Sequence, residues 1–225
     1  LVTNANSMWL NDKPFKKDLE IALNRKVKLM NDANCFTLSE AVDGAGKDYQ
    51  SIFGIIVGTG FGGALSYKKE IIEGANQIAG DWGHQPLPYP TKEEIETKIN
   101  CPSMNCGRPL CAEQFMSGIG FKDVFNQKHK TSFTSEEIVK LDLNGDPRAN
   151  SELSLYEDRM ARLLAVMIGI FDPDAIILGG GISNIDRFYV NIPTLIPKYT
   201  FSNKVKTKVL KNFHGDSSGV RGAAW

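Results

Sequence analysis

SLYEDRMARLLAVMIGIFDPDAIILGGGIS, residues 154–183 of the 225-residue chain, decides the fold class. Apolar residues recur at helical spacing up to Phe171, which predicts a long amphipathic helix that ends at Asp172 and Pro173. The run AIIL at 175–178 contains no polar residue, as expected of a strand that is buried on both faces of a parallel sheet. A helix followed by such a strand indicates an α/β fold.

The rest of the chain continues this alternation. KPFKKDLEIALN (13–24) has apolar residues at four-residue steps, and KVKLM (26–30) after it predicts a short strand. YQSIFGIIVGTGFGGALSYKKEII (49–72) predicts a strand, a glycine turn and a second strand. Further helices are predicted at 33–42 and 185–199.

Composition and charge exclude several classes of partner. The 26 basic residues equal the 26 acidic residues, so no net charge favours nucleic acid or an anionic membrane. No stretch approaches the roughly 20 apolar residues that cross a bilayer, and the N-terminus lacks the features of a signal peptide. We therefore expect a cytoplasmic protein without membrane or nucleic-acid partners.

The stretch CPSMNCGRPLCAE (101–113) holds three of the four cysteines, Cys101, Cys106 and Cys111. Its prolines and glycine exclude a continuous helix. A tetrahedral zinc site needs one further donor, and His84 in GDWGHQPLP supplies it. The alternative is three ordinary loop thiols, but the polar composition of the loop favours zinc. The fourth cysteine, Cys35, lies in a helical pattern and is expected in the core.

Two glycine-rich turns follow predicted strands. GTGFGG (58–63) and the glycines of LGGGIS (179–181) let backbone N–H groups approach an anion closely. Alone, the first turn is equally well explained as a tight hairpin. Two such turns together with an acidic residue at a strand end favour a nucleotide site.

That acidic residue is Asp32 in MNDAN. A carboxylate at the end of a strand and at the start of a helix is suited to act as a base toward a polyol hydroxyl. A carboxylate there is equally suited to be the N-cap of the helix. Spacing alone does not separate the two interpretations.

Several stretches, spread from end to end, together carry a family resemblance: NANSMWL, NDANCFTLSEAVDGAG, GTGFGG, GDWGHQPLP, CGRPLCAEQFMSGIGF, DPDAIILGGGISNIDR and HGDSSGVRGAAW. The chain resembles the ROK family (repressors, open reading frames and kinases), and in particular its bacterial fructokinase members. The resemblance implies the actin-like ATPase (ribonuclease H-like) fold, in which two α/β lobes enclose a cleft.

The resemblance also implies the roles of individual residues. Asp32 becomes the general base. Sugar-binding residues are Asn6, Asn31, Asp32, Asp81, His84 and Glu113. ATP is bound by Gly58, Thr59, Gly60, Gly62 and Gly63 at the phosphates and by Gly179, Gly180 and Gly181 beside the adenosine. A structural Zn²⁺ is bound by His84, Cys101, Cys106 and Cys111, and Mg²⁺ accompanies ATP.

The domain arrangement follows from the same resemblance. Residues 1–30 correspond to the end of the N-terminal lobe, 31–211 to the C-terminal lobe with the zinc loop 84–113, and 212–225 to a C-terminal helix that packs back toward the N-terminal lobe. The Asp-x-Gly-Gly-Thr phosphate hairpin of the family is absent from the sequence. We therefore expect most of the N-terminal lobe to be missing and the chain alone to turn over little. The family also implies a homodimer.

Two positions depart from the family pattern. Met104 stands where the first cysteine is expected, so Cys101 must reach the metal through a longer loop. Asp81 replaces a sugar-binding glutamate and is one methylene shorter.

The function implied is ATP-dependent phosphorylation of a hexose, with D-fructose to fructose 6-phosphate as the main expectation. The alternatives are mannose, glucose or N-acetylglucosamine as the substrate, or a sugar-sensing domain of a ROK-type transcriptional repressor. Retention of Asp32 and of both glycine turns favours the kinase.

Overall fold

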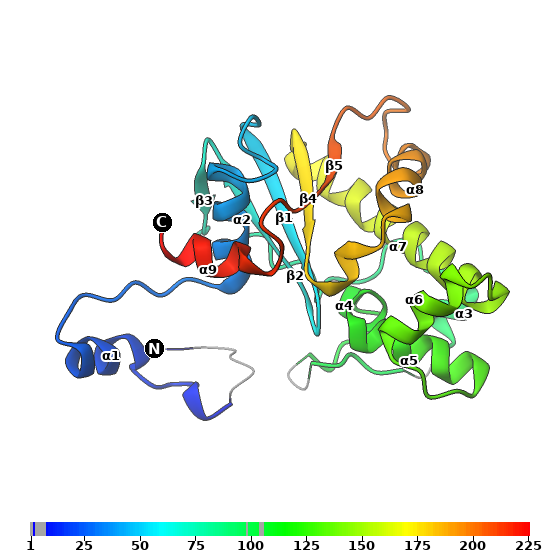
Figure 1. The fold of residues 1–225 in the computed structure, drawn as a ribbon, viewed down its shortest axis with the longest axis horizontal. Helices are drawn as coiled ribbons and strands as arrows, with labels where there is room; N and C mark the ends of the chain where they lie inside the picture. Colours follow the sequence, from blue (N-terminus) through cyan, green and yellow to red (C-terminus); the bar gives the residue numbers. More distant parts are fainter. Residues whose placement is uncertain (1, 3–7, 98, 104–105) are drawn as a thin grey trace.

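The computed structural model describes residues 2, 8–97, 99–103 and 106–225, and its centre is a five-stranded mixed sheet of order β3-β2-β1-β4-β5 (Figure 1). The strands are β1 (Ser51–Val57), β2 (Phe61–Tyr67), β3 (Glu70–Ile72), β4 (Ala175–Gly179) and β5 (Lys208–Lys211). β1, β2 and β3 are antiparallel neighbours, whereas β4 is parallel to β1 and to β5. The short strands β3 and β5 form the two edges, and the side chains of Lys208 and Lys211 on β5 are exposed.

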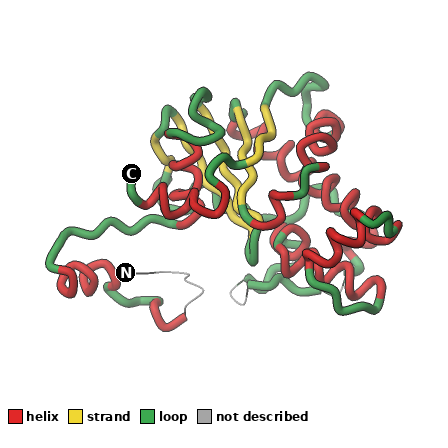
Figure 2. Tube along the Cα trace, in the orientation of Figure 1, coloured by secondary structure: helices red, strands yellow, loops and turns green. Residues whose placement is uncertain are grey.

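Helices cover both faces of this sheet (Figure 2). The α-helices are α1 (Phe15–Leu23), α2 (Asp32–Val42), α3 (Lys92–Ile95), α4 (Ala112–Met116), α5 (Gly118–His129), α6 (Ser135–Leu143), α7 (Pro147–Phe171), α8 (Arg187–Leu195) and α9 (Ser218–Ala223). The 3₁₀ turns are η1 (Met8–Leu10), η2 (Gly181–Asn184), η3 (Ile196–Lys198) and η4 (Gly215–Ser217). None of the helices in the described ranges is both long and apolar enough to span a bilayer.

The helix and strand that decide the fold class form as predicted. Asp146 caps α7 by accepting from two backbone N–H groups, Pro147 is its first residue, and Asp172 ends it in the left-handed conformation. Every residue of β4 is buried, as expected of a strand inside a parallel sheet. Because α7 packs on one face of β1 and β4, their apolar side chains form the larger core.

The opposite face of the sheet is covered by α2, and α9 packs against α2 (Figure 1). A smaller core of Phe36, Ala41, Ile52 and Ile177 lies beneath them. Cys35 is buried in α2, as predicted. The α2–α9 pair is closely packed, because a Cβ on Gly222 would lie 1.7 Å from the backbone oxygen of Cys35.

A buried carboxylate, Glu40, joins α2 to the C-terminal segment. It accepts hydrogen bonds from the N–H groups of Ala45 (2.9 Å), Phe213 (3.0 Å) and His214 (3.3 Å) and from the hydroxyl of Ser218 (2.7 Å). Such a set of donors offsets the cost of burying a carboxylate. The C-terminal helix is thus held on α2, while its relation to a first lobe and the domain boundaries at 30 and 211 remain predictions.

The N-terminal segment differs from the body of the protein. Helix α1 forms as predicted but buries none of its residues, and an extended segment joins it to α2 (Figure 1). The strand predicted at 26–30 is wrong, since these residues have no strand conformation, and Leu29 and Met30 are 47% and 41% exposed. A strand needs a neighbour with which to pair, and local sequence does not reveal whether one exists.

Candidate functional site

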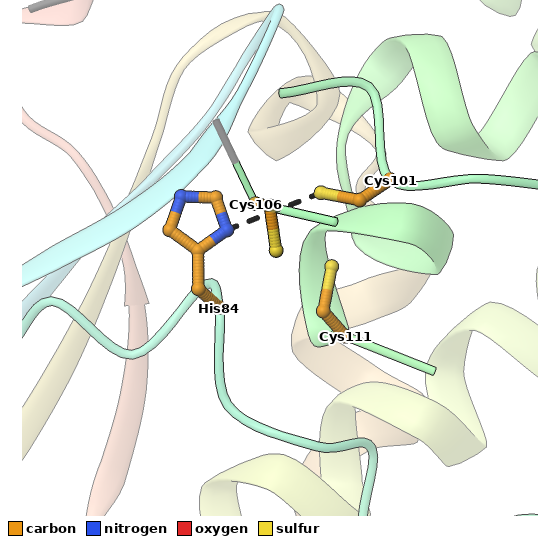
Figure 3. Close-up of side chains that lie close together, drawn as sticks. All are labelled: His84, Cys101, Cys106 and Cys111. Carbon is orange, nitrogen blue, oxygen red and sulfur yellow. Dashed lines mark hydrogen bonds between the residues drawn. The ribbon is translucent and has the colours of Figure 1, made fainter. Parts of the chain in front are cut away.

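The four predicted zinc ligands lie together. One donor atom from each of His84, Cys101, Cys106 and Cys111 can be chosen so that all four lie within 4.8 Å of one another. Nδ1 of His84 faces the sulfur of Cys101 at 4.0 Å (Figure 3). Cys111 is buried and the other three side chains are partly buried.

Backbone pairing brings the two ends of this cluster together. The chain at 83–87 runs antiparallel to 110–113, with an isolated bridge between Pro86 and Cys111. Three backbone hydrogen bonds join the two segments. The N–H of Leu87 donates to the carbonyl oxygen of Leu110 (2.8 Å), the N–H of Ala112 donates to that of Gln85 (2.8 Å), and the N–H of Glu113 donates to that of Gly83 (2.7 Å). His84 and Cys111 therefore have fixed relative positions before any metal binds.

The donor set fits a structural zinc ion. A tetrahedral site with Zn–S bonds of about 2.3 Å holds its sulfurs roughly 3.8 Å apart. The four donor atoms here all lie within 4.8 Å of one another, which is compatible with such a site. Burial and the neighbouring Cys111 raise the pKa of the Cys101 thiol, and burial raises the pKa of Cys111. Metal binding has to displace the protons of these thiols. Because Nδ1 of His84 faces the sulfurs, its Nε2 is the nitrogen that remains for another partner.

A buried ionic network holds the chain between His84 and Cys101, and the sequence did not predict it. Glu94, at the end of a capping box that Thr91 begins, forms ion pairs with Arg159 (2.8 Å) and Arg162 (2.7 Å) of α7. Arg162 also donates to the backbone oxygens of Pro88 and Tyr89. Burial raises the pKa of Glu94, but the two arginines lower it further, so it lies below its ordinary value.

A sequence signal for this network existed. TKEE at 91–94 matches the capping-box pattern. The two arginines fall among the apolar residues that α7 directs into the core, where a charged side chain requires a partner. The partner itself lies at least 65 positions away and could not be chosen from sequence.

The first glycine turn is the hairpin between β1 and β2. The N–H of Gly58 donates to the oxygen of Gly60 at 3.0 Å, and a Cβ on Gly58 or Gly62 would meet no atom within 4 Å. These positions leave open space beside the backbone, as an anion requires. Gly63 differs, because its Cβ would lie 2.7 Å from the ring of Phe53, and its role is close packing.

The second glycine turn follows β4, at the end of the sheet where the parallel strands β1 and β4 both end. Gly180 has a φ of 84°, and its Cβ would lie 2.4 Å from the backbone oxygen of Val57. Gly179 packs against the ring of Phe36, whereas Gly181 faces open space. The two turns are therefore neighbours at the carboxyl ends of parallel strands, which is where open α/β sheets bind ligands.

Glu113 lies between the cluster and the first turn. Glu113 is the second residue of α4 and is 8% exposed. Oε2 accepts from the backbone N–H of Phe61 at 3.2 Å, and Oε1 lies 3.8 Å from the sulfur of Cys101. The sequence predicted a sugar contact for this carboxylate and missed both protein contacts.

Asp32 is the first residue of α2 and is exposed. The N-cap is its neighbour Asn31, whose side chain accepts from the N–H groups of Ala33 and Asn34. The capping function proposed for Asp32 is therefore filled by Asn31. Among the described residues, no hydrogen bond or ion pair joins Asp32 to His84 or Glu113.

Within the described part of the chain, no hydrogen bond or ion pair joins Asp81 to the cluster. Asp81 is exposed, and its backbone N–H donates to Ile78 at 3.1 Å. Asn6 lies outside the described residues. The structure thus assembles the zinc ligands, Glu113 and the two glycine turns, while Asp32 and Asp81 stand at exposed positions.

Comparison with known proteins gives consistent matches. The sequence profile of the ROK family matches residues 1–225. An N-acetyl-D-glucosamine kinase of Vibrio atlanticus (strain LGP32) is 38% identical over 213 residues, which cover 95% of this chain and 70% of that protein.

Solved structures share the fold. A ROK hexokinase from Thermus thermophilus superposes with a TM-score of 0.81 and 25% identity over 96% of this chain and 69% of that one. A ROK family glucokinase from Streptomyces griseus, in complex with glucose and AMPPNP, gives a TM-score of 0.80 and 23% identity over 95% of this chain and 72% of that one. The predicted actin-like ATPase fold is therefore confirmed.

Proposed function

The chain belongs to the ROK family, and we propose that it is an ATP-dependent sugar kinase whose substrate is N-acetyl-D-glucosamine. The observation that carries this proposal is the 38% identity over 95% of the chain with an N-acetyl-D-glucosamine kinase. That level of identity outweighs the short motifs that favoured D-fructose. Fructose becomes the second candidate, and mannose and glucose follow.

Phosphoryl transfer requires positioning and charge neutralisation more than covalent chemistry by the protein. The two adjacent glycine turns offer open space beside the backbone at Gly58, Gly62 and Gly181. This suits ATP phosphates at 58–63 and adenosine at 179–181. Mg²⁺ bound with ATP would neutralise phosphate charge.

Asp32 is proposed as the general base that orients and deprotonates the attacking sugar hydroxyl. It is exposed at the first turn of α2, so a ligand can reach its carboxylate. The oxygen of the Asn31 side chain is used in capping, which leaves its amino group as the donor for a sugar oxygen. Asn6, Asp81, His84 and Glu113 complete the proposed sugar contacts.

A structural zinc ion held by His84, Cys101, Cys106 and Cys111 would fix the sugar-binding face of the loop. With Nδ1 on the metal side, Nε2 of His84 would face a sugar hydroxyl. Support of this kind matters because a misplaced side chain loses much of its effect on the reaction. A homodimer remains a proposal from the family resemblance.

The test is a coupled ADP-release assay on the full-length protein with MgATP and a panel of N-acetylglucosamine, fructose, mannose and glucose, with zinc determined on the same sample. We expect the highest kcat/KM with N-acetylglucosamine and about one zinc per chain. Highest kcat/KM with fructose would restore the fructokinase interpretation. No turnover with any sugar, from folded and zinc-loaded protein, would reject the kinase and favour the sugar-sensing repressor.

A further inference from the structure

We propose that Glu113 is a positioning residue that couples the Cys/His cluster to the first glycine turn, so that zinc and nucleotide each strengthen the binding of the other. This inference rests on the proposed function, because it requires zinc at the cluster and ATP phosphates at the turn. It goes beyond the sugar contact expected for Glu113.

The two oxygens of Glu113 have different partners. Oε2 accepts from the N–H of Phe61, the residue at which the turn becomes β2, and Oε1 accepts from the thiol of Cys101 at 3.8 Å. Because zinc would displace the proton of this thiol, metal binding changes the contact at Oε1 directly. A buried carboxylate is costly unless hydrogen bonds stabilise it. One side chain therefore spans the distance from a proposed metal ligand to the backbone of the proposed phosphate turn.

The backbone around Glu113 makes a second connection between the same two regions. Cys111 is the N-cap of α4, and Glu113 is two residues farther along the chain. At the end of α4, the N–H of Ser117 donates to the oxygen of Glu113 at 3.1 Å, and the N–H of Gly118 donates to the oxygen of Gly58 at 2.7 Å. The α4 segment thus holds the turn on both sides, at Gly58 and at Phe61.

The space around Gly60 supports the same role. A Cβ at Gly60 would lie 3.3 Å from Oε2 of Glu113, so the carboxylate lies directly beneath the tip of the turn. A shift of the carboxylate changes the direction of the Phe61 N–H and with it the path of the turn. Since coupling between two sites is reciprocal, nucleotide bound at the turn must favour metal binding by the factor with which metal favours nucleotide.

The experiment measures the zinc affinity of the full-length protein by competition with a chromophoric chelator, with and without saturating MgADP. We expect MgADP to tighten zinc binding by roughly 5- to 150-fold in the wild-type protein. Glu113→Ala should reduce this ratio to near one, and Glu113→Gln should restore part of it, since an amide oxygen still accepts from Phe61. Glu136→Gln removes the same charge at an exposed position and should retain the full ratio.

The outcomes separate the inference from the proposed function. A wild-type ratio near one, with MgADP shown by calorimetry to bind, would overturn the inference and leave the kinase proposal intact. Absence of MgADP binding would reject both. A Glu113→Ala variant that melts at lower temperature but keeps the wild-type ratio would show a purely structural role and overturn the inference. If the alanine variant does not fold, Glu113→Gln replaces it, and a full wild-type ratio in Glu113→Gln would overturn the inference.

Discussion

Two sides of the proposed active site are built differently. The side formed by the Cys/His cluster, Glu113 and the glycine turns is held by buried hydrogen bonds and ion pairs. The other side, formed by Asp32 and Asp81, is exposed and makes few protein contacts. Residues of the first side therefore serve the fold and the site together, whereas packing does not account for the residues of the second side. Substitutions should separate the two.

The largest effect is expected on the exposed side. Asp32→Asn should lower kcat by about 10²- to 10⁴-fold, since a positioned general base contributes that much, while sugar affinity changes little. Steady-state kinetics and sugar binding by calorimetry measure the two effects. Asp48→Asn, also exposed, is the control and should leave kcat unchanged. Near-normal turnover by Asp32→Asn would remove the assigned role.

On the packed side, Arg162→Leu should lower the free energy of unfolding by about 3 kcal/mol or more, because it removes one of the cations that neutralise the buried carboxylate of Glu94. Urea denaturation followed by circular dichroism measures it. Lys92→Ala breaks an exposed pair with Glu96, the C-cap residue of α3, and should change stability by less than about 1 kcal/mol. Equal losses for the two variants would contradict the importance of the buried network.

The second glycine turn gives a matched pair of substitutions. Gly180→Ala should destabilise the protein by about 2–4 kcal/mol, since it places a side chain at positive φ and against the oxygen of Val57. Gly181→Ala adds a methyl group in open space and should alter stability little, but it should raise the KM for ATP if adenosine lies there. Thermal melts and ATP kinetics of both variants distinguish packing from binding. An unchanged KM for Gly181→Ala would place the adenosine elsewhere.

The smallest effect is expected where α9 meets α2. Burial raises the pKa of Asp43, but hydrogen bonds from His214 and Arg221 lower this pKa further, so that it lies below its ordinary value of 3.8. A lowered pKa in the folded state stabilises the protein above pH 3.8, and this contribution is lost as the pH falls through the folded value. The stability difference between the wild type and Asp43→Asn should therefore be small at pH 7 and vanish under strong acid. A difference that grows toward low pH would contradict this assignment.

The sequence predicted the parts of the molecule that depend on local pattern. The apolar spacing through Phe171, the uninterrupted apolar run at 175–178 and the glycines at 58–63 each gave the observed helix, strand or hairpin. The cluster of three cysteines and His84 was predicted because zinc chemistry demands a fourth donor.

What the sequence did not predict depends on contacts between distant residues. The prediction of a strand at 26–30 was wrong, because the local sequence does not reveal whether a neighbouring strand exists for it to pair with. Asn31 and Asp32 are both good N-caps, and only the backbone geometry assigns the cap to Asn31. Glu113 gains Phe61 as a partner 52 positions away, which no motif contains.

The ends of the sheet bear on how the protein behaves at high concentration. An unpaired edge strand is a template for aggregation with another chain. Here β3 has three residues, β5 has four, and the exposed ends of β5 are Lys208 and Lys211. Short edges and like charges oppose edge-to-edge pairing, so the sheet itself should resist fibril formation even when the protein is concentrated.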